Sequence, residues 1–267
     1  MKSRLDRYLV DQGYCRSRSQ AQELISNGLV ELQQGAQWVK ATKPSQALIM
    51  DTPVRILANE LQKYVSRGAL KLIGALEHCE LDITGMRVID VGQSTGGFTQ
   101  VVLERGAGNV TGIEVGHQQL AENLRADSRV QVFEGVNARD LRQWFQNQKD
   151  NTSSGPPGLP GEPANQPFDL AVMDVSFISQ TQILPGLSSV LKPGGYLISL
   201  VKPQFEVGPK GLGKGGIVSD PALYESVEKT ICSSCRETGL EVLHYFDSPI
   251  QGGDGNREFF VVARKLV

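Results

Sequence analysis

Two lysines and two carboxylic acids occupy positions from which they could act together on one substrate. Lys71 lies in an expected helix ahead of the first strand of the larger part of the chain. Asp174 ends one expected strand and Lys202 ends the next, while Glu258 begins the last. Polar groups at such strand ends gather at the active edge of a doubly wound sheet. We therefore expect these four side chains to form one catalytic group.

Removal of a proton from a hydroxyl is the chemistry that suits such a group. A ribose hydroxyl is a poor nucleophile near neutral pH and needs a base within hydrogen-bond reach. A lysine amine can serve when burial and a second cation lower its pKa. Lys202 is the candidate base and Lys71 the second cation, and Asp174 and Glu258 would orient the amines. No metal is required, although each residue taken singly could be a solvated charge or a helix cap.

A glycine-rich turn in V-I-D-V-G-Q-S-T-G-G-F-T, residues 88–99, follows the first of these strands and leads into a helix. Glycines let the backbone come close to a ligand. The Walker ending Gly-Lys-Ser/Thr is missing and G-x-G-x-x-G is not met, which disfavours a phosphate loop. NAD is the runner-up to another nucleoside cofactor. The candidate cofactor-binding residues of the turn are Asp90, Gly92, Ser94, Thr95, Gly96, Gly97 and Phe98.

The next strand ends in a carboxylate, Glu114. A carboxylate at that position can accept hydrogen bonds from both ribose hydroxyls of an adenosine. Asn137 and Asp140 follow the third strand and are candidate neighbours of the adenine. Asp174 is assigned to the cofactor site as well as to the catalytic group. The sequence thus predicts an adenosine pocket beside the four catalytic candidates.

Alternation of strands and helices predicts the fold that positions these residues. Apolar strand-like segments are separated, in most cases, by helical ones, which indicates an α/β, Rossmann-like sheet with helices on both faces. The last two strands have no helix between them and predict an antiparallel hairpin. We expect this domain over residues 66–267, with a flexible surface insert at 149–167 that is rich in Pro, Gly and Ser. The expected strands are 87–90, 110–115, 130–133, 170–174, 196–201, 241–245 and 259–262.

A second, smaller α+β domain is expected over residues 1–58, joined by a linker at 59–65. Two short helices, the second capped by Ser17 or Ser19, precede strand-like pieces at 29–32, 38–40 and 54–57. Residues 1–71 carry eleven Lys and Arg against six Asp and Glu, a net charge of +5, whereas the rest of the chain carries −7. A basic unit on an acidic body suggests that a polyanion is held at one end, although a solvated basic face is the alternative.

The motifs R-L-D-R-Y-L-V, S-R-S-Q-A-Q-E-L-I and N-G-L-V of this small domain resemble the αL-type, ribosomal-protein-S-four-like RNA-binding domain. The resemblance covers about 55 residues. It implies that Arg4, Arg7, Arg16 and Arg18 face structured RNA. A small helical domain that binds protein is the other interpretation.

The larger domain resembles FtsJ-like 2′-O-methyltransferases, whose Lys-Asp-Lys-Glu tetrad matches the four catalytic candidates in chain order. The chain resembles the TlyA-type, hemolysin-A-like rRNA methyltransferases over nearly its full length. The motifs that carry this resemblance include Y-V-S-R-G-A-L-K-L, M-D-V-S-F-I-S and L-V-K-P-Q-F-E-V-G. The resemblance implies transfer of a methyl group from S-adenosylmethionine (SAM) to a cytidine 2′-hydroxyl of ribosomal RNA, with Arg67 among the RNA-binding residues. Gln93 departs from the family in replacing a small residue, which puts the affinity for SAM in doubt.

Composition bounds the remaining possibilities. The chain has 267 residues, 40% hydrophobic and 21% charged, which is ordinary for a globular protein. No apolar run reaches the roughly 18 residues of a membrane helix, and no secretory signal is evident, so a cytoplasmic protein without a membrane or obligate protein partner is expected. The four cysteines predict no zinc site. A hemolysin and a non-catalytic RNA-binding ribosome assembly factor are the alternatives from other functional classes.

Overall fold

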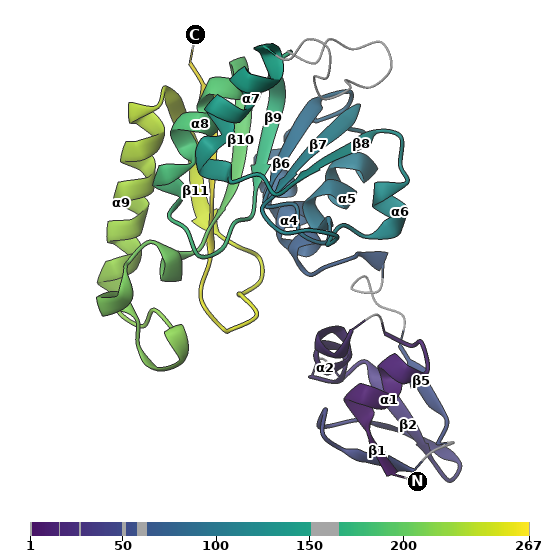
Figure 1. The fold of residues 1–267 in the computed structure, drawn as a ribbon. Helices are drawn as coiled ribbons and strands as arrows, with labels where there is room; N and C mark the ends of the chain where they lie inside the picture. Colours follow the sequence, from purple (N-terminus) through teal and green to yellow (C-terminus); the bar gives the residue numbers. More distant parts are fainter. Residues whose placement is uncertain are drawn as a thin grey trace. The chain divides into compact units, whose positions relative to one another are not determined.

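The computed structural model describes residues 2–15, 17–26, 28–49, 52–57, 63–150 and 166–266. The chain divides into two compact units, residues 1–63 and 64–267, and each is considered by itself (Figure 1). Most of the expected insert at 149–167, and most of the expected linker at 59–65, lie outside the described residues.

The smaller unit packs two helices, α1 and α2, against short antiparallel strands. Leu5 and Leu9 of α1 and Leu24 of α2 are buried in its core. The second helix is capped by the Ser17 hydroxyl, which accepts a hydrogen bond from the Gln20 backbone N–H at 3.2 Å. The strands at Val30–Gln34 (β2), Gln37–Lys40 (β3) and Val54–Ile56 (β5) form one sheet. A separate pair, β1 (Lys2–Arg4) and β4 (Ala47–Ile49), was not expected; the helices are Leu5–Asp11 (α1) and Arg18–Ser26 (α2).

The larger unit is built on a seven-stranded sheet in the order β11-β12-β10-β9-β6-β7-β8. Five neighbouring strands run parallel, and β12 lies antiparallel between β10 and β11, so the expected final hairpin is confirmed. All seven strands overlap the segments that the sequence predicted, although β10 begins at Leu191, five residues before the expected strand. They span Arg87–Val91 (β6), Asn109–Glu114 (β7), Val130–Glu134 (β8), Phe168–Met173 (β9), Leu191–Val201 (β10), Leu240–Asp247 (β11) and Phe259–Lys265 (β12).

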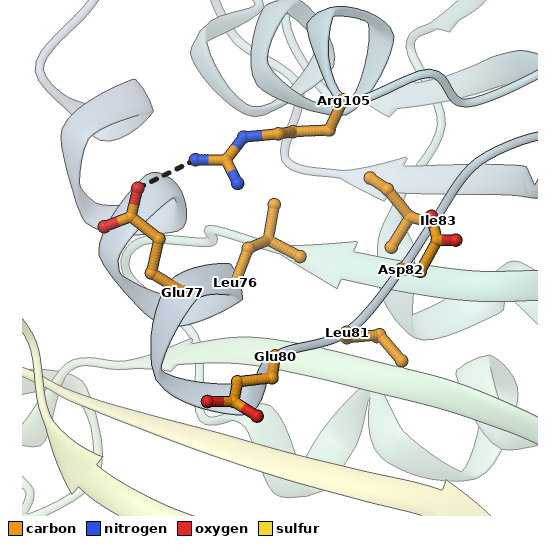
Figure 2. Close-up of a pocket in the computed structure, with 7 residues that line it drawn as sticks. All are labelled: Leu76, Glu77, Glu80, Leu81, Asp82, Ile83 and Arg105. Carbon is orange, nitrogen blue, oxygen red and sulfur yellow. Dashed lines mark hydrogen bonds and ion pairs between the residues drawn. The ribbon is translucent and has the colours of Figure 1, made fainter.

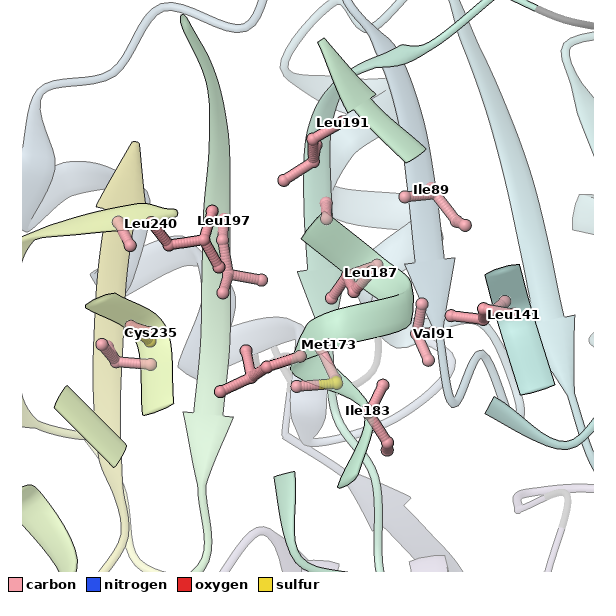
Figure 3. Close-up of a cluster of buried hydrophobic side chains, with 14 of the residues drawn as sticks. Ile89, Val91, Leu141, Met173, Ile183, Leu187, Leu191, Leu197, Cys235 and Leu240 are labelled. Carbon is pink, nitrogen blue, oxygen red and sulfur yellow. The ribbon is translucent and has the colours of Figure 1, made fainter. Parts of the chain in front are cut away.

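The sheet is covered on both faces because successive side chains of each strand point in opposite directions. Along β6, Val88 packs into one buried cluster, whereas Ile89 and Val91 pack into the other. Leu141, Leu187 and other members of the second cluster are drawn in Figure 3. Helices α7, α8 and α9 supply that face, and α4, α5 and α6 supply the opposite one. They span Gly68–Cys79 (α4), Gly97–Glu104 (α5), Glu122–Arg125 (α6), Leu141–Asp150 (α7), Leu184–Val190 (α8) and Pro221–Glu237 (α9).

The topology brings the functional candidates to one edge of the sheet. The parallel strands β6, β7, β9 and β10 all end at that edge, and the antiparallel strand β12 begins there. Residues that follow the parallel strands and the residue that precedes β12 are therefore neighbours, although they come from distant parts of the sequence.

Candidate active site

Strand register assembles three of the four catalytic candidates. Val201 of β10 is paired with Phe259 of β12, which sets Lys202 beside Glu258 at the sheet edge. Asp174 directly follows β9, the parallel neighbour of β10 on its other side. The edge of three adjacent strands therefore presents a lysine between two carboxylates.

The four side chains form two ion pairs. Lys71, from α4, donates to Glu258 with 2.6 Å between Nζ and Oε2, and both side chains are almost fully buried. Lys202 Nζ lies 2.6 Å from Asp174 Oδ1 and 3.0 Å from the Ser176 hydroxyl. The sequence-predicted set is thus brought together as two lysine–carboxylate pairs that meet at the ends of β10 and β12.

A pocket of about 550 Å³ opens at the same edge. It lies within the 300–1,000 Å³ that small-molecule sites usually span. Five of the predicted cofactor residues line it, and so does Ser176, the hydroxyl partner of Lys202. The five are Gly92, Ser94, Glu114, Asn137 and Asp174. Apolar side chains of Ile113, Val115, Val136, Ile178 and Ile183 complete walls suited to a purine.

Glu114 is held in a fixed orientation on the pocket wall. Its Oε2 accepts from the backbone N–H of Ser94 at 2.8 Å, and its Oε1 accepts from that of Gly116 at 2.8 Å. Ser94 has a φ of +48°, a left-handed conformation that non-glycine residues seldom adopt. Each carboxylate oxygen has a further lone pair, so two hydroxyls of a ribose can still be accepted. The carboxylate is pre-oriented for that contact.

The first glycine of the turn, Gly92, is required both by its backbone conformation and by the space around it. Its φ is +83°, and a Cβ there would lie 2.5 Å from the backbone oxygen of Asp174. The turn after β6 is thereby packed against the end of β9. This contact joins the cofactor turn to the strand that carries one of the catalytic candidates.

The remaining candidates of the turn are not among the residues that line the pocket. Thr95, Gly96 and Gly97 do not line the pocket, and Phe98 packs in the core against Phe260 with ring centroids 6.5 Å apart. Asp90 is fully buried. Burial raises the pKa of its carboxyl to about 7, against a hydrogen bond from the Thr99 hydroxyl that lowers it. Asp140 also does not line the pocket.

Asp90 Oδ1 is buried without a hydrogen-bond partner among the described residues. Buried carboxylate oxygens are ordinarily paired, so this one is suited to receive a group that the protein does not itself supply. The glycine turn, the Glu114 carboxylate, the apolar walls and this buried oxygen fit an adenosine that carries an amino-acid tail.

Phe177 is a site residue that the sequence reasoning missed. It lines the pocket, its side chain is 89% exposed, and its φ of +64° is unusual for a bulky residue. Its ring lies 5.0 Å from that of Phe205. Backbone strain of this kind gathers at functional sites. The signal available in the sequence was an aromatic residue three positions after the strand-end carboxylate.

Two arginines of the smaller unit, Arg4 and Arg18, are held by one buried acid, Asp6. Arg4 donates to both of its oxygens at 3.0 Å each, and Arg18 donates to Oδ2 at 3.0 Å. The two guanidinium side chains remain 51% and 57% exposed. Hydrogen bonds from Arg4, ahead of those from Gln22 and Arg18, hold the pKa of the Asp6 carboxyl far below its usual range against its burial.

The other predicted RNA-binding arginines have different surroundings. Arg7 is exposed and lies 3.5 Å from Asp11. Arg67, in the larger unit, donates to the Gln251 backbone oxygen at 3.2 Å, and Arg16 lies outside the described residues. Among the predicted RNA-binding arginines, Arg4 and Arg18 are therefore the two whose half-exposed guanidinium groups share one carboxylate.

A second pocket, of about 320 Å³, lies at the C-terminal ends of α4 and α5 (Figure 2). Glu77 is paired there with Arg105 at 2.9 Å, beside Glu80 and Asp82. It shares no residue with the predicted sites. Among the described residues, no cluster of His, Cys, Asp and Glu could hold a metal ion, and no helix is long and apolar enough to cross a membrane.

Comparison with known proteins adds independent information. Residues 64–265 match the model of the FtsJ-like methyltransferases, and residues 3–35 match the S4 domain. The chain is 39% identical over 263 residues to the 16S/23S rRNA (cytidine-2′-O)-methyltransferase TlyA of Mycobacterium tuberculosis, covering 98% of this chain and 90% of that protein. Hemolysin A of Brachyspira hyodysenteriae is 34% identical, over 96% of this chain and 97% of its own.

Solved structures give the same result. A structure from Streptococcus thermophilus, described as that of a hemolysin, has a TM-score of 0.72 and 37% identity. The match covers 99% of this chain and 89% of the Streptococcus thermophilus chain. The similarity therefore extends over both units and is not confined to the cofactor turn.

Proposed function

Because the chain belongs to the TlyA family of FtsJ-like methyltransferases, we propose that it transfers a methyl group from SAM to a ribose 2′-hydroxyl of ribosomal RNA, most specifically that of a cytidine. The nucleoside is taken from the name of the Mycobacterium tuberculosis relative. Ribosomal RNA as the substrate makes the cytoplasm the site of action and ribosomal subunits the partners.

One observation carries the proposal: the Asp174–Lys202 pair lies at a pocket suited to a nucleoside. Asp174 and Ser176 line that pocket, and both contact the Lys202 amine. A base and a cofactor pocket must adjoin if a hydroxyl oxygen is to lose its proton as it reacts with a bound methyl donor. The Lys71–Glu258 pair lies directly beside them through the pairing of β10 with β12.

Each residue of the catalytic group has its own role in the proposed methyl transfer. Bound SAM supplies a methyl group on a positively charged sulfur. The Lys202 amine would accept the proton of the ribose hydroxyl, and Asp174 and Ser176 would fix the direction of that amine. Lys71 brings a second positive charge to the site, with its own position set by Glu258. Most of the rate enhancement then comes from alignment of the hydroxyl with the methyl group.

Cofactor binding uses the pocket walls described above. Glu114 would accept hydrogen bonds from the ribose hydroxyls, and Asn137, which lines the same pocket, would contact the adenine. The unpartnered oxygen of Asp90 lies beneath the turn as a candidate acceptor for the amino-acid end. Gly92 keeps the turn close enough to β9 for these groups to act on one ligand.

RNA contacts would come from both units. Phe177 offers an exposed ring at the pocket mouth, and stacking on an aromatic side chain is a common way to hold a nucleobase that has left its helix. Arg4 and Arg18 each keep N–H groups that Asp6 does not use, and these can bind phosphate. The smaller unit would then hold structured RNA while the larger one acts on a single nucleotide.

A hemolysin is the second candidate, because two of the similar proteins carry that name. A non-catalytic assembly factor is the third. Both would leave the paired lysines and the adjoining nucleoside pocket without a use. Methyl transfer uses all of these features, and for that reason the geometry supports it best.

The decisive experiment combines purified protein, isotopically labelled SAM and each ribosomal subunit in turn. We expect label on the RNA, and nuclease digestion with mass spectrometry should locate it on the 2′-oxygen of a cytidine. Label on a base would contradict the reaction proposed, and lysis of red cells in the absence of SAM would favour the hemolysin. Absence of label with both subunits and with free rRNA would count against methyl transfer altogether.

A further inference from the structure

A chain of three buried side chains runs beneath the cofactor turn. Gln93 donates through Nε2 to the Thr99 hydroxyl oxygen at 2.8 Å, and that hydroxyl donates to Asp90 Oδ2 at 2.6 Å. All three side chains are buried. Gln93 does not line the pocket, so its side chain acts from under the turn and not from the pocket wall.

The Gln93 amide decides which way the Thr99 hydroxyl points. A hydroxyl has one proton to donate and two lone pairs with which to accept. Because an amide N–H occupies one lone pair, the proton is left to point at Asp90, and successive hydrogen bonds of this kind strengthen one another. Without the amide, Thr99 could rotate and give its proton elsewhere.

The neighbouring strand of the sheet, β7, leaves room for the Gln93 amide. A Cβ at Gly112 of β7 would lie 2.0 Å from Gln93 Oε1, so the glutamine occupies space that only a glycine leaves. Gln93 Oε1 has no hydrogen-bond partner among the described residues. Burying an amide oxygen in this state has an energetic cost, which indicates that the donor end of the amide makes the useful contact.

Asp90 is the group on which this contact acts. Burial above all, together with the nearby charges of Asp174 and Glu114, raises the pKa of its carboxyl to about 7, and hydrogen bonds from Thr99 oppose that rise. The charged groups near Asp90 come from two neighbouring strands. Asp174, which is paired with Lys202, follows β9, and Glu114 ends β7. Whether Asp90 is charged near neutral pH therefore depends on its hydrogen bonds.

We propose that Gln93 is a positioning residue that keeps Asp90 ionised through Thr99 and thereby makes the site prefer the cationic cofactor to the uncharged-sulfur product, S-adenosylhomocysteine. This inference rests on the proposed use of SAM. The two ligands differ by a methyl group and one positive charge at sulfur. A buried carboxylate beneath the pocket favours the charged ligand, because opposite charges attract strongly where water is excluded.

The test replaces Gln93 with methionine, which keeps the length of the side chain and removes the donor. Binding of SAM and of S-adenosylhomocysteine is measured by calorimetry from pH 5.5 to 9. In Gln93→Met, the pH midpoint of the preference for SAM should rise by about half a unit, and the preference at pH 7 should fall by about twofold. Gln143→Met, at an exposed position on α7, is the matched control and should leave both unchanged.

A double-variant cycle separates the hydrogen-bond chain from a general packing effect. In a Thr99→Val background there is no hydroxyl to orient, so Gln93→Met should have no further effect on the midpoint. Thr99→Ser, which keeps the hydroxyl and leaves Gln93 in place, should retain the wild-type midpoint. An unchanged midpoint in Gln93→Met, or the same shift with and without the Thr99 hydroxyl, would overturn the proposal.

A measurement without any ligand distinguishes failure of this inference from failure of the proposed function. The carboxyl carbon of Asp90 is followed by ¹³C NMR during a pH titration of the wild-type protein and of Gln93→Met. A higher titration midpoint in the variant supports the chain of hydrogen bonds even if SAM is not a ligand. Identical midpoints overturn the chain even if SAM binds tightly.

Discussion

Lys71 and Glu258 are 187 positions apart in the sequence, yet their charged ends are 2.6 Å apart and almost fully buried. Lys71 comes from the helix before β6, and Glu258 from the residue before β12. A buried pair of this kind is expensive to break and contributes little net stability compared with apolar residues of similar size. Its presence at the sheet edge therefore calls for a functional explanation, which the catalytic group provides.

Breaking this pair should destabilise the larger unit. Glu258→Gln leaves the Lys71 charge buried beside a neutral amide, and the free energy of unfolding should fall by about 3 kcal/mol. Lys71→Met combined with Glu258→Gln should recover part of that loss, because no uncompensated charge remains. Methyl transfer should stay absent in the double variant. Chemical denaturation and the labelled-SAM assay measure the two quantities, and recovery of activity along with stability would show that the pair is only structural.

Lys202→Ala should abolish methyl transfer, with a rate at least about 100-fold lower, because the candidate base is removed. The affinity for SAM should change little, since Lys202 does not line the nucleoside pocket. Lys192→Ala is the control, because that lysine lies on the same strand and pairs with Asp169 outside the site. Turnover close to that of the wild type in Lys202→Ala would remove this residue from the role of base.

Asp90 should make the larger unit less stable as the pH rises. The folded-state pKa, about 7, is above that of an unfolded aspartate, so the folded protein holds the proton more tightly. The stabilising contribution is complete below about pH 4 and is lost as the pH rises to about 7. In Asp90→Asn this loss should disappear, so the variant gains stability relative to the wild type between those pH values. Denaturant titrations at pH 5 and 8 measure the free energy of unfolding of both proteins. The same difference between variant and wild type at the two pH values would contradict this prediction.

Tyr245→Phe should leave stability unchanged or raise it by about 1 kcal/mol. The Tyr245 hydroxyl is buried without a hydrogen-bond partner among the described residues, and burial raises the pKa of the phenol. Removing an unsatisfied polar group from an apolar environment relieves its desolvation cost. The ring itself should keep its stacking on Phe259, with centroids 5.4 Å apart. A clear loss of thermal stability in this variant would show that the hydroxyl has a bonding partner.

Asp6→Asn should weaken RNA binding through the arginines that it holds. Arg4 and Arg18 would keep their charges but lose the charged acceptor that fixes their direction. Arg4→Ala should reduce the salt dependence of RNA affinity by about one unit of log–log slope if its guanidinium binds one phosphate. Gln12→Ala, at an exposed uncharged position directly after the same helix, is the control. Equal affinities at 50 and 200 mM salt for all variants would exclude an electrostatic role for these residues.

Strands, turn and residue types were evident in the sequence because they depend on local patterns. Apolar runs separated by helices predicted the seven strands of the larger unit, and the final hairpin followed from two strands without a helix between them. The candidate catalytic residues were chosen because each flanks a strand or lies on the preceding helix. Local reasoning also narrowed the cap of the second helix to Ser17 or Ser19, since capping involves residues only a few positions apart, and the structure shows that Ser17 is the cap.

Pairing and burial were decided by the tertiary structure alone. Local sequence does not decide which lysine pairs with which carboxylate. Lys71 pairs with Glu258, and Lys202 with Asp174, because strand order and register set the distances between them. Phe98, which was expected at the cofactor, packs in the core, whereas Phe177 lines the pocket and is exposed. The direction in which Gln93 points depends on Gly112 of the neighbouring strand. Sequence determines which groups are available and on which element, but only the packing of one element on another determines which of them meet.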